Sequence, residues 1–95
     1  MTRIGPRTTV VRPDSLQETA RRLARLRLAF GLSQAELCRR TGISTTTWNN
    51  YEKAYSRSDL EKAFILVRTF GVTLDWIYLA NPAGLSQQLT LQLAP

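Results

Sequence analysis

Apolar residues recur at intervals of three and four along most of this chain, which is the spacing of one face of an α-helix. The pattern predicts a first helix from about residue 14 to about Phe30. Four shorter helices are predicted after it, over 34–41, 45–52, 59–70 and 74–79. Residues 89–93 alternate between leucine and polar residues, which is typical of a strand. We therefore expect an all-α domain of five helices, followed by a short extended segment.

Serine residues placed three positions before a glutamate mark the start of two of these helices. Ser33 precedes Glu36, and Ser58 precedes Glu61. At this spacing the serine hydroxyl and the glutamate carboxylate can each accept a backbone N–H at the helix start, so Ser33 and Ser58 are the predicted N-caps. Gly42 fits the left-handed residue that closes the helix over 34–41.

The helix that begins after Ser44 has an apolar side and a polar side. Trp48 and Tyr51 are three residues apart, so they share a face, and we expect this face to point into the core. Four polar side chains are then left on the outer face: Thr45, Thr46, Asn49 and Asn50. Three consecutive threonines lower the helix propensity without a packing gain, so contact with a ligand is favoured over a merely solvated surface.

Two helices joined by a short turn that contains a glycine form a helix-turn-helix, whose second helix enters the major groove of DNA. Asparagine can bond two atoms of adenine, and the threonine methyl group can pack on the thymine methyl group. Residues 44–50 contain no arginine or lysine, so the commonest contact to guanine is missing from them. We therefore predict a preference for A·T base pairs.

The charge of the chain points to the same partner. Thirteen lysine and arginine residues stand against seven acidic ones, which gives a net charge of +6. All of these cations except Lys53 and Lys62 are arginines, which suit phosphate contacts, although a basic surface can also serve solubility alone. Lys53 and Arg57 lie in the loop beyond the predicted recognition helix and are candidates for phosphate contacts.

Other classes of function find little support in the composition. The chain has no histidine and one cysteine, Cys38, so we expect no metal site, no disulfide framework, no cofactor and no catalytic centre. No apolar run approaches the length of a membrane span, and the basic start lacks the apolar core of a signal peptide. We predict a cytoplasmic, nucleoid-associated protein that is not an enzyme.

Composition divides the chain into three parts. Residues 1–13 combine arginines and prolines without a helical period, which predicts a flexible basic arm that either lies in a minor groove or contacts nothing. Residues 14–81 hold the five predicted helices of the DNA-binding domain. Residues 82–95 are expected to form a flexible C-terminal tail, which is a candidate dimerisation segment.

Several short stretches together are similar to the lambda-repressor and Cro type of helix-turn-helix domain, also called the Xre family. The similarity extends over about residues 20–80, and these segments carry it: 26–27, 31–37, 42–44, 51–52 and 71–76. Because they occur in the family's order with compatible spacing, the resemblance is more specific than a lone turn motif. It implies a compact all-α DNA-binding fold.

The resemblance also implies roles for single residues. The positions that match the family's DNA contacts are Gln34, Ser44 and Thr47 for phosphates and support, and Thr45, Thr46, Asn49 and Asn50 for base edges and their flanks. Arg27 and Glu52 match a partly buried ion pair. Trp48 stands where the family often has a branched aliphatic residue, so we expect it to change how the recognition helix is seated.

A single domain of this size reads few base pairs, so we predict a two-fold homodimer on an inverted-repeat operator. Apolar side chains of the fifth predicted helix are the leading interface candidates, followed by others on the fourth helix and in the tail. These candidates are Trp76, Ile77, Leu79, Phe64, Ile65 and the 89–93 segment. For Trp76, a place in the core is an equally good alternative.

The predicted function is a small transcriptional regulator of phage or bacterial type, which represses by blocking RNA polymerase on double-stranded DNA. The alternative from another class is an antitoxin, which would bind a toxin through its tail and also bind its own operator. An enzyme is the least favoured class, because the usual catalytic residues are missing.

Overall fold

The computed structural model describes residues 12–94 and shows six helices in that range. They are α1 (Leu16–Ala29), α2 (Gln34–Thr41), α3 (Thr45–Glu52), α4 (Leu60–Phe70), α5 (Leu74–Leu79) and α6 (Gln87–Gln92). The five predicted helices are all present, and the sixth was not predicted. None of the six is long and apolar enough to cross a membrane.

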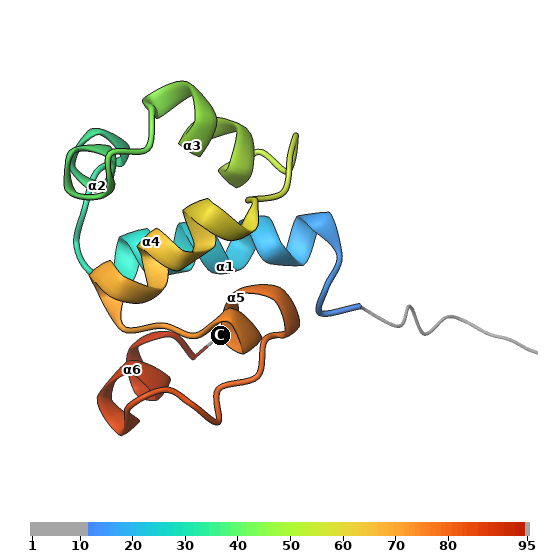
Figure 1. The fold of residues 1–95 in the computed structure, drawn as a ribbon. Helices are drawn as coiled ribbons and strands as arrows, with labels where there is room; N and C mark the ends of the chain where they lie inside the picture. The colour runs from blue at the N-terminus through green and yellow to red at the C-terminus, as the bar shows by residue number, and fades with distance from the viewer. Residues whose placement is uncertain (1–11, 95) are drawn as a thin grey trace, which may run out of the picture.

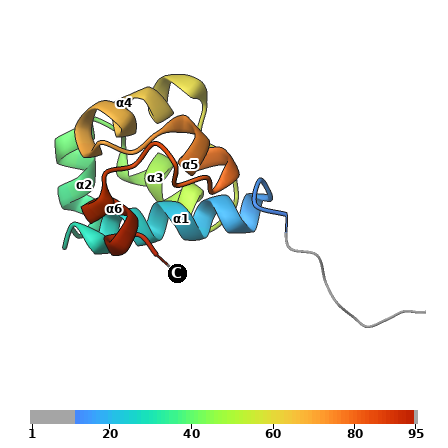
Figure 2. The ribbon, with the colours of Figure 1, turned by 90° about the horizontal axis from the view of Figure 1, so that it is seen from below.

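Helices α1 and α4 form the middle of the domain and separate two pairs of helices (Figure 1). The pair α2 and α3 lies on one side of them, and the pair α5 and α6 lies on the other. Helix α1 packs against both α3 and α5, and α4 packs against both α2 and α5. In the view from the α5–α6 side, α6 lies in front of one part of α1 (Figure 2). This arrangement leaves one side of α3 without a neighbour among the six described helices.

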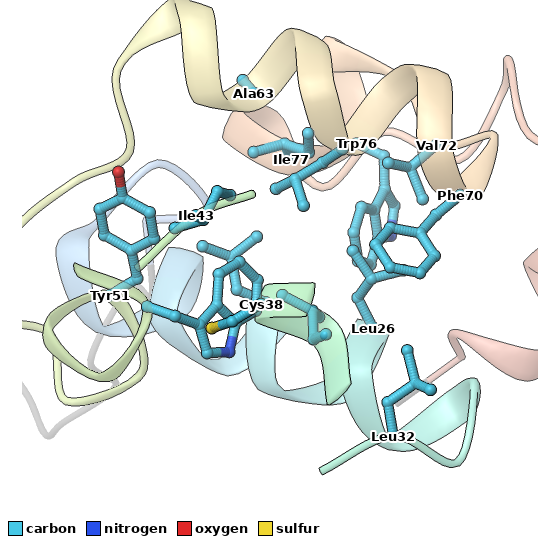
Figure 3. Close-up of a cluster of buried hydrophobic side chains, with 14 of the residues drawn as sticks. Leu26, Leu32, Cys38, Ile43, Tyr51, Ala63, Phe70, Val72, Trp76 and Ile77 are labelled. Carbon is cyan, nitrogen blue, oxygen red and sulfur yellow. The ribbon is translucent and has the colours of Figure 1, made fainter. Parts of the chain in front are cut away.

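The core is one apolar cluster to which each of the helices α1 to α5 contributes (Figure 3). Leu26 of α1, Leu37 of α2, Trp48 of α3, Leu66 of α4 and Ile77 of α5 have no exposed surface. Burying side chains of this size stabilises the fold by about 1.5–3 kcal/mol each, which makes the cluster the main source of stability. The thiol of Cys38 is buried in the same cluster.

One predicted helix start was placed one residue too early. The predicted N-cap of α4, Ser58, is buried, and its hydroxyl lies 3.3 Å from that of Tyr78. Tyr78 also donates to the Ser58 carbonyl oxygen at 3.0 Å, so the Ser58 side chain is turned toward α5. Asp59 takes the capping position instead, and its carboxylate accepts the backbone N–H of Lys62 at 2.8 Å.

The prediction of a strand over 89–93 was wrong, because this segment is mostly helical. Ser86 caps α6 by accepting the N–H of Leu89 at 3.1 Å. Leu89 and Leu93 are four residues apart, so a helix brings both to the core, whereas Leu91 stays 74% exposed. A lone strand would also have no ladder partner, since no strand occurs between residues 12 and 94.

The described part of the predicted tail, 82–94, therefore belongs to the folded domain. Leu93 is 4% exposed and closes the core beside α1 and α5. Arg25 of α1 donates to the carbonyl oxygen of Ala94 at 3.1 Å, which holds the end of this segment in place. Of the predicted basic arm, 1–11 lie outside the described residues.

We expect the Leu93→Ala substitution to lower the free energy of unfolding by about 2–4 kcal/mol, because it removes a buried side chain and leaves a cavity. Leu91→Ala is the matched control, since it truncates a leucine in the same segment that is mostly exposed. Its effect should stay within about 0.5 kcal/mol. Urea titration followed by circular dichroism measures both. Equal effects of the two substitutions would show that the segment is not packed on the core.

A buried arginine links α1 to the end of α5. Arg22 is 8% exposed, and its Nε and Nη2 atoms donate to the carbonyl oxygen of Ile77 at 3.0 and 2.9 Å. Nη2 also donates to the carbonyl oxygen of Pro13 at 2.6 Å. Burial lowers the pKa of Arg22. Its guanidinium provides hydrogen bonds for carbonyl groups that lie before the start of α1 and near the end of α5.

Candidate nucleic-acid interface

The turn between α2 and α3 is held by local contacts that set the angle of the second helix. Gly42 adopts the left-handed conformation with φ of 77°, as predicted, and its N–H donates to the Cys38 carbonyl oxygen. Ile43 is 2% exposed and fills the space between the two helices. The Thr41 hydroxyl accepts the Ile43 N–H at 3.2 Å and donates to the Leu37 carbonyl oxygen. The turn is therefore anchored by both apolar and polar contacts.

The inner face of α3 is apolar, as predicted from its sequence. Trp48 is 0% exposed and Tyr51 is 5% exposed. Their rings meet in a T-shaped arrangement with 5.9 Å between the centroids. Aromatic pairs of this geometry add to the stabilisation that burial gives. These two side chains seat α3 on the core and fix which of its faces points outward.

The outer face of α3 carries the predicted base-contacting residues. Thr45 and Thr46 are exposed, and Asn49 and Asn50 are partly exposed. Within residues 12–94, the side chains of these four residues take part in no hydrogen bond. Their polar atoms are therefore available to a ligand.

The N-terminal end of α3 is capped by the side chain of Ser44, the residue just before the helix. The Ser44 hydroxyl accepts the Thr47 N–H at 3.1 Å and donates to the Thr47 hydroxyl at 2.8 Å. Ser44 is exposed and Thr47 is partly exposed. The first N–H groups of α3 remain directed at solvent, where an anion can accept them.

The predicted ion pair between Arg27 and Glu52 is confirmed. Arg27 Nε lies 2.7 Å from Glu52 Oε2, and Arg27 Nη2 lies 3.0 Å from Oε1, so the pair is bidentate. The two side chains are 17% and 10% exposed. Arg27 also donates through Nη1 to the carbonyl oxygen of Leu32 at 2.9 Å. The pair therefore connects the end of α3 to α1, and Arg27 also connects α1 to the turn that precedes α2.

Glu52 accepts more than the ion pair. The indole N–H of Trp48 donates to its carboxylate, and Gln34 is a further side-chain partner. Burial by itself would raise the pKa of Glu52, but the hydrogen bonds from Arg27, Trp48 and Gln34 outweigh burial and hold the pKa below its ordinary value. Glu52 is therefore charged at neutral pH and joins α1, α2 and α3 at one point.

Residues 23–77 of this chain match the sequence profile of the helix-turn-helix family. The chain belongs to that family. The match confirms the resemblance seen in the sequence and includes α2, α3 and the Arg27–Glu52 pair.

A curated relative of this helix-turn-helix chain is an uncharacterized HTH-type transcriptional regulator, YobD, of Bacillus subtilis (strain 168). The two are 34% identical over 56 residues, which is 59% of this chain and 50% of the relative. The chain thus spans half the length of the curated relative that it matches. No solved structure matches the chain significantly.

The helix-turn-helix has two further predicted phosphate contacts, Lys53 and Arg57, in the loop after α3. Lys53 is exposed, and its Nζ atom lies 6.0 Å from the ring centroid of Tyr55. Arg57 is exposed as well, but Nη1 donates to the carbonyl oxygen of Asp14 at 2.7 Å. Arg57 therefore stabilises the start of α1 in this structure, whereas the Lys53 ammonium stands free of any carboxylate between residues 12 and 94.

The interface candidates fall into two groups in the helix-turn-helix domain. Trp76 and Ile77 are 4% and 0% exposed, so both belong to the core, which for Trp76 was the alternative left open by the sequence. Both are members of the buried apolar cluster, so they offer almost no surface to a second copy. Three other candidates remain accessible, namely Leu79 at 55%, Phe64 at 41% and the partly exposed Ile65. The 89–93 segment is divided, because Leu93 is in the core and Leu91 is 74% exposed.

Proposed function

We propose that this chain is a sequence-specific regulator of transcription that binds double-stranded DNA with α3 in the major groove. The observation that carries the proposal is the outer face of α3, where Thr45, Thr46, Asn49 and Asn50 have no hydrogen-bond partners within residues 12–94. Trp48 holds this helix from beneath, so the polar face is presented on a rigid support.

The chemistry of this face supports a preference for A·T base pairs. The side-chain N–H of Asn50 can donate to adenine N7 while its Oδ1 accepts the adenine N6–H, and the methyl groups of Thr45 and Thr46 can pack on thymine. Asn49 flanks them on the same exposed side. Each such contact discriminates against a wrong base by about 1–3 kcal/mol.

Phosphate contacts would add affinity that does not depend on sequence. The chain carries a net charge of +6, and Lys53 projects from the loop at the end of α3. Gln34, Ser44 and Thr47 lie at the starts of α2 and α3, where backbone N–H groups face solvent. Binding should therefore weaken steeply as the salt concentration rises.

The proposal includes a two-fold homodimer that recognises an inverted-repeat operator and represses transcription. Leu79 of α5, together with Phe64 and Ile65 of α4, supplies exposed apolar surface for the contact. Two recognition helices would then reach half-sites about one helical turn apart, or roughly 34 Å.

Selection from random-sequence DNA, followed by binding measurements on the selected site, tests the readout. We expect Thr46→Ala and Asn50→Ala to weaken binding to that site by about 5–150-fold, which corresponds to 1–3 kcal/mol, while binding to unrelated DNA stays nearly unchanged. Thr69→Ala is the matched control, because Thr69 is another exposed helical threonine and lies on α4. Guanine at every strongly selected position, or equal losses for Thr69→Ala, would contradict the proposed readout.

Sedimentation of the protein with and without its selected DNA tests the homodimer. Leu79→Asp is expected to shift the protein to a monomer, because the aspartate would place a charge in an apolar contact. Leu91→Asp changes a leucine of α6 that is 74% exposed and lies outside the proposed contact, so it should leave association unchanged. A wild-type protein that remains monomeric on DNA at every concentration would remove the dimer from the proposal without affecting recognition by a single domain.

A further inference from the structure

A cavity of about 350 Å³ lies between α1, α5 and α6. Trp76, Leu85 and Leu93 give it an apolar wall, and two of these side chains are almost fully buried. Figures 1 and 2 show α5 and α6 on the side of α1 and α4 that faces away from α3. The cavity is therefore separate from the proposed DNA-binding face.

Three arginines of α1 supply the opposite wall of this cavity. Arg21, Arg22 and Arg25 line it, and Glu18 is the one acidic lining residue in the described part of the chain, so these four side chains carry a net charge of +2. Arg21 pairs with Glu18 at 3.5 Å, but its side chain is 74% exposed, and an exposed pair of this kind contributes little.

The guanidinium of Arg22 is held by backbone carbonyl groups and not by a carboxylate of residues 12–94. Arg22 as a whole is 8% exposed, so this charge is largely buried. Buried charges in proteins are normally paired with an opposite charge. One N–H of Arg25 donates to the Ala94 carbonyl oxygen, and the other N–H groups of its guanidinium are available to another acceptor.

We propose that this cavity binds a small organic carboxylate with an apolar body. The apolar body would pack on Trp76, Leu85 and Leu93, and the carboxylate would accept hydrogen bonds from Arg21 and Arg25 at the rim. Arginine presents its donors in a planar fork that matches a carboxylate, which a neutral ligand could not use. The volume is at the lower end of the range for small-molecule sites, about 300–1,000 Å³, so the ligand is small.

A second, shallower hollow shares Arg21 and Arg25 and extends over Leu28 and Ala29 on the other side of them. None of its lining residues in the described part of the chain is aromatic, so it offers less surface to an apolar body. We therefore place the apolar part of the ligand beside Trp76.

Nuclear magnetic resonance titration of the full chain, without DNA, tests the proposal. The probes are decanoate, used below its micellar concentration, and decanol, which has the same apolar body and no charge. We expect decanoate to shift the Trp76 indole resonance and the Leu93 and Ala94 amides, and to bind at least tenfold more tightly than decanol.

Two double variants separate the cavity arginines from general charge. Arg21→Gln with Arg25→Gln should weaken decanoate binding at least tenfold. Arg39→Gln with Arg40→Gln removes the same charge from exposed positions of α2 and should leave binding within twofold. Thermal unfolding checks that each variant is folded, and the comparison of decanoate with decanol on the unaltered chain decides the question even if one variant is not.

Three results would overturn the proposal. One is equal affinity for decanoate and decanol, another is an equal loss in both double variants, and the third is a set of shifts centred on Leu28 and Ala29 instead of Trp76. None of them depends on whether the chain binds DNA, so failure here and failure of the proposed function are distinguishable.

Discussion

Replacing Trp48 with alanine is expected to lower the free energy of unfolding by about 3–5 kcal/mol. The indole is fully buried at the centre of α3, packs on Tyr51, and donates to Glu52. Truncation would leave a large cavity beneath the recognition helix and remove one hydrogen bond from a buried carboxylate. A loss of this size is comparable to the whole stability of a small domain, so we expect the variant to be largely unfolded.

Urea or thermal unfolding followed by circular dichroism measures the effect. Trp48→Phe keeps most of the packing and removes the N–H donor, so it should lose less than the alanine variant. Tyr55→Ala is a control for truncation of an aromatic residue, because Tyr55 is 70% exposed. A Trp48→Ala variant within about 1 kcal/mol of the unaltered protein would mean that the indole is not the support of α3.

Removing the negative charge of Glu52 should have the next largest effect. Breaking a buried ion pair from one side costs about 3–5 kcal/mol, because the remaining charge stays buried without its partner. In the Glu52→Ala variant that charge is Arg27, which is 17% exposed. We expect a loss near the lower end of this range, and we expect Arg27→Met to give a comparable loss.

The double variant, Arg27→Met with Glu52→Ala, should lose less than the sum of the two single losses, since neither charge is then left alone. Unfolding measurements on the four proteins of this cycle give the coupling. Strict additivity would show that the two side chains do not interact in solution.

The pH dependence of stability offers a second measurement on Glu52. The pKa of Glu52 in the folded protein is lowered from the ordinary value of 4.5. The charged carboxylate therefore adds to the free energy of unfolding at pH values above 4.5. The contribution is lost as the pH falls through the lower folded pKa, so stability should decline below about pH 4.5. Glu52→Gln should flatten the decline, and an unchanged pH profile would contradict the assigned contacts. Other carboxylates with lowered pKa values, such as Glu36, are present in both proteins and cancel in the comparison.

Much of the recognition unit was predictable because its signals are local. Ser33, Glu36 and Gly42 act within one turn of the backbone that they cap, so the bounds of α2 followed from spacing alone. The inward positions of Trp48 and Tyr51 followed from helical periodicity. The hydrogen bond from Trp48 to Glu52 was missed, although its spacing of four residues was a usable signal.

The C-terminal segment was mispredicted because its conformation depends on distant residues. Alternating leucines suit a strand when a neighbouring strand is present, and they suit a helix when the core lies on one side. Here Leu93 is buried in the core formed by the other helices and Leu89 packs against that core, and this settles the choice. Similarly, nothing near Arg22 in the sequence shows that it will reach the carbonyl oxygen of Ile77, which is 55 residues away.

By itself, the sequence determined the five main helices, the turn between α2 and α3, and the polar face of α3, because caps, glycines and periodicity act over a few residues. The tertiary structure decided that Trp76 and Ile77 are in the core, that α6 closes the domain, and that the cavity lined by arginines exists. These features depend on which surfaces meet when distant helices pack, and packing is set by the shape and burial of the whole core rather than by neighbouring residues.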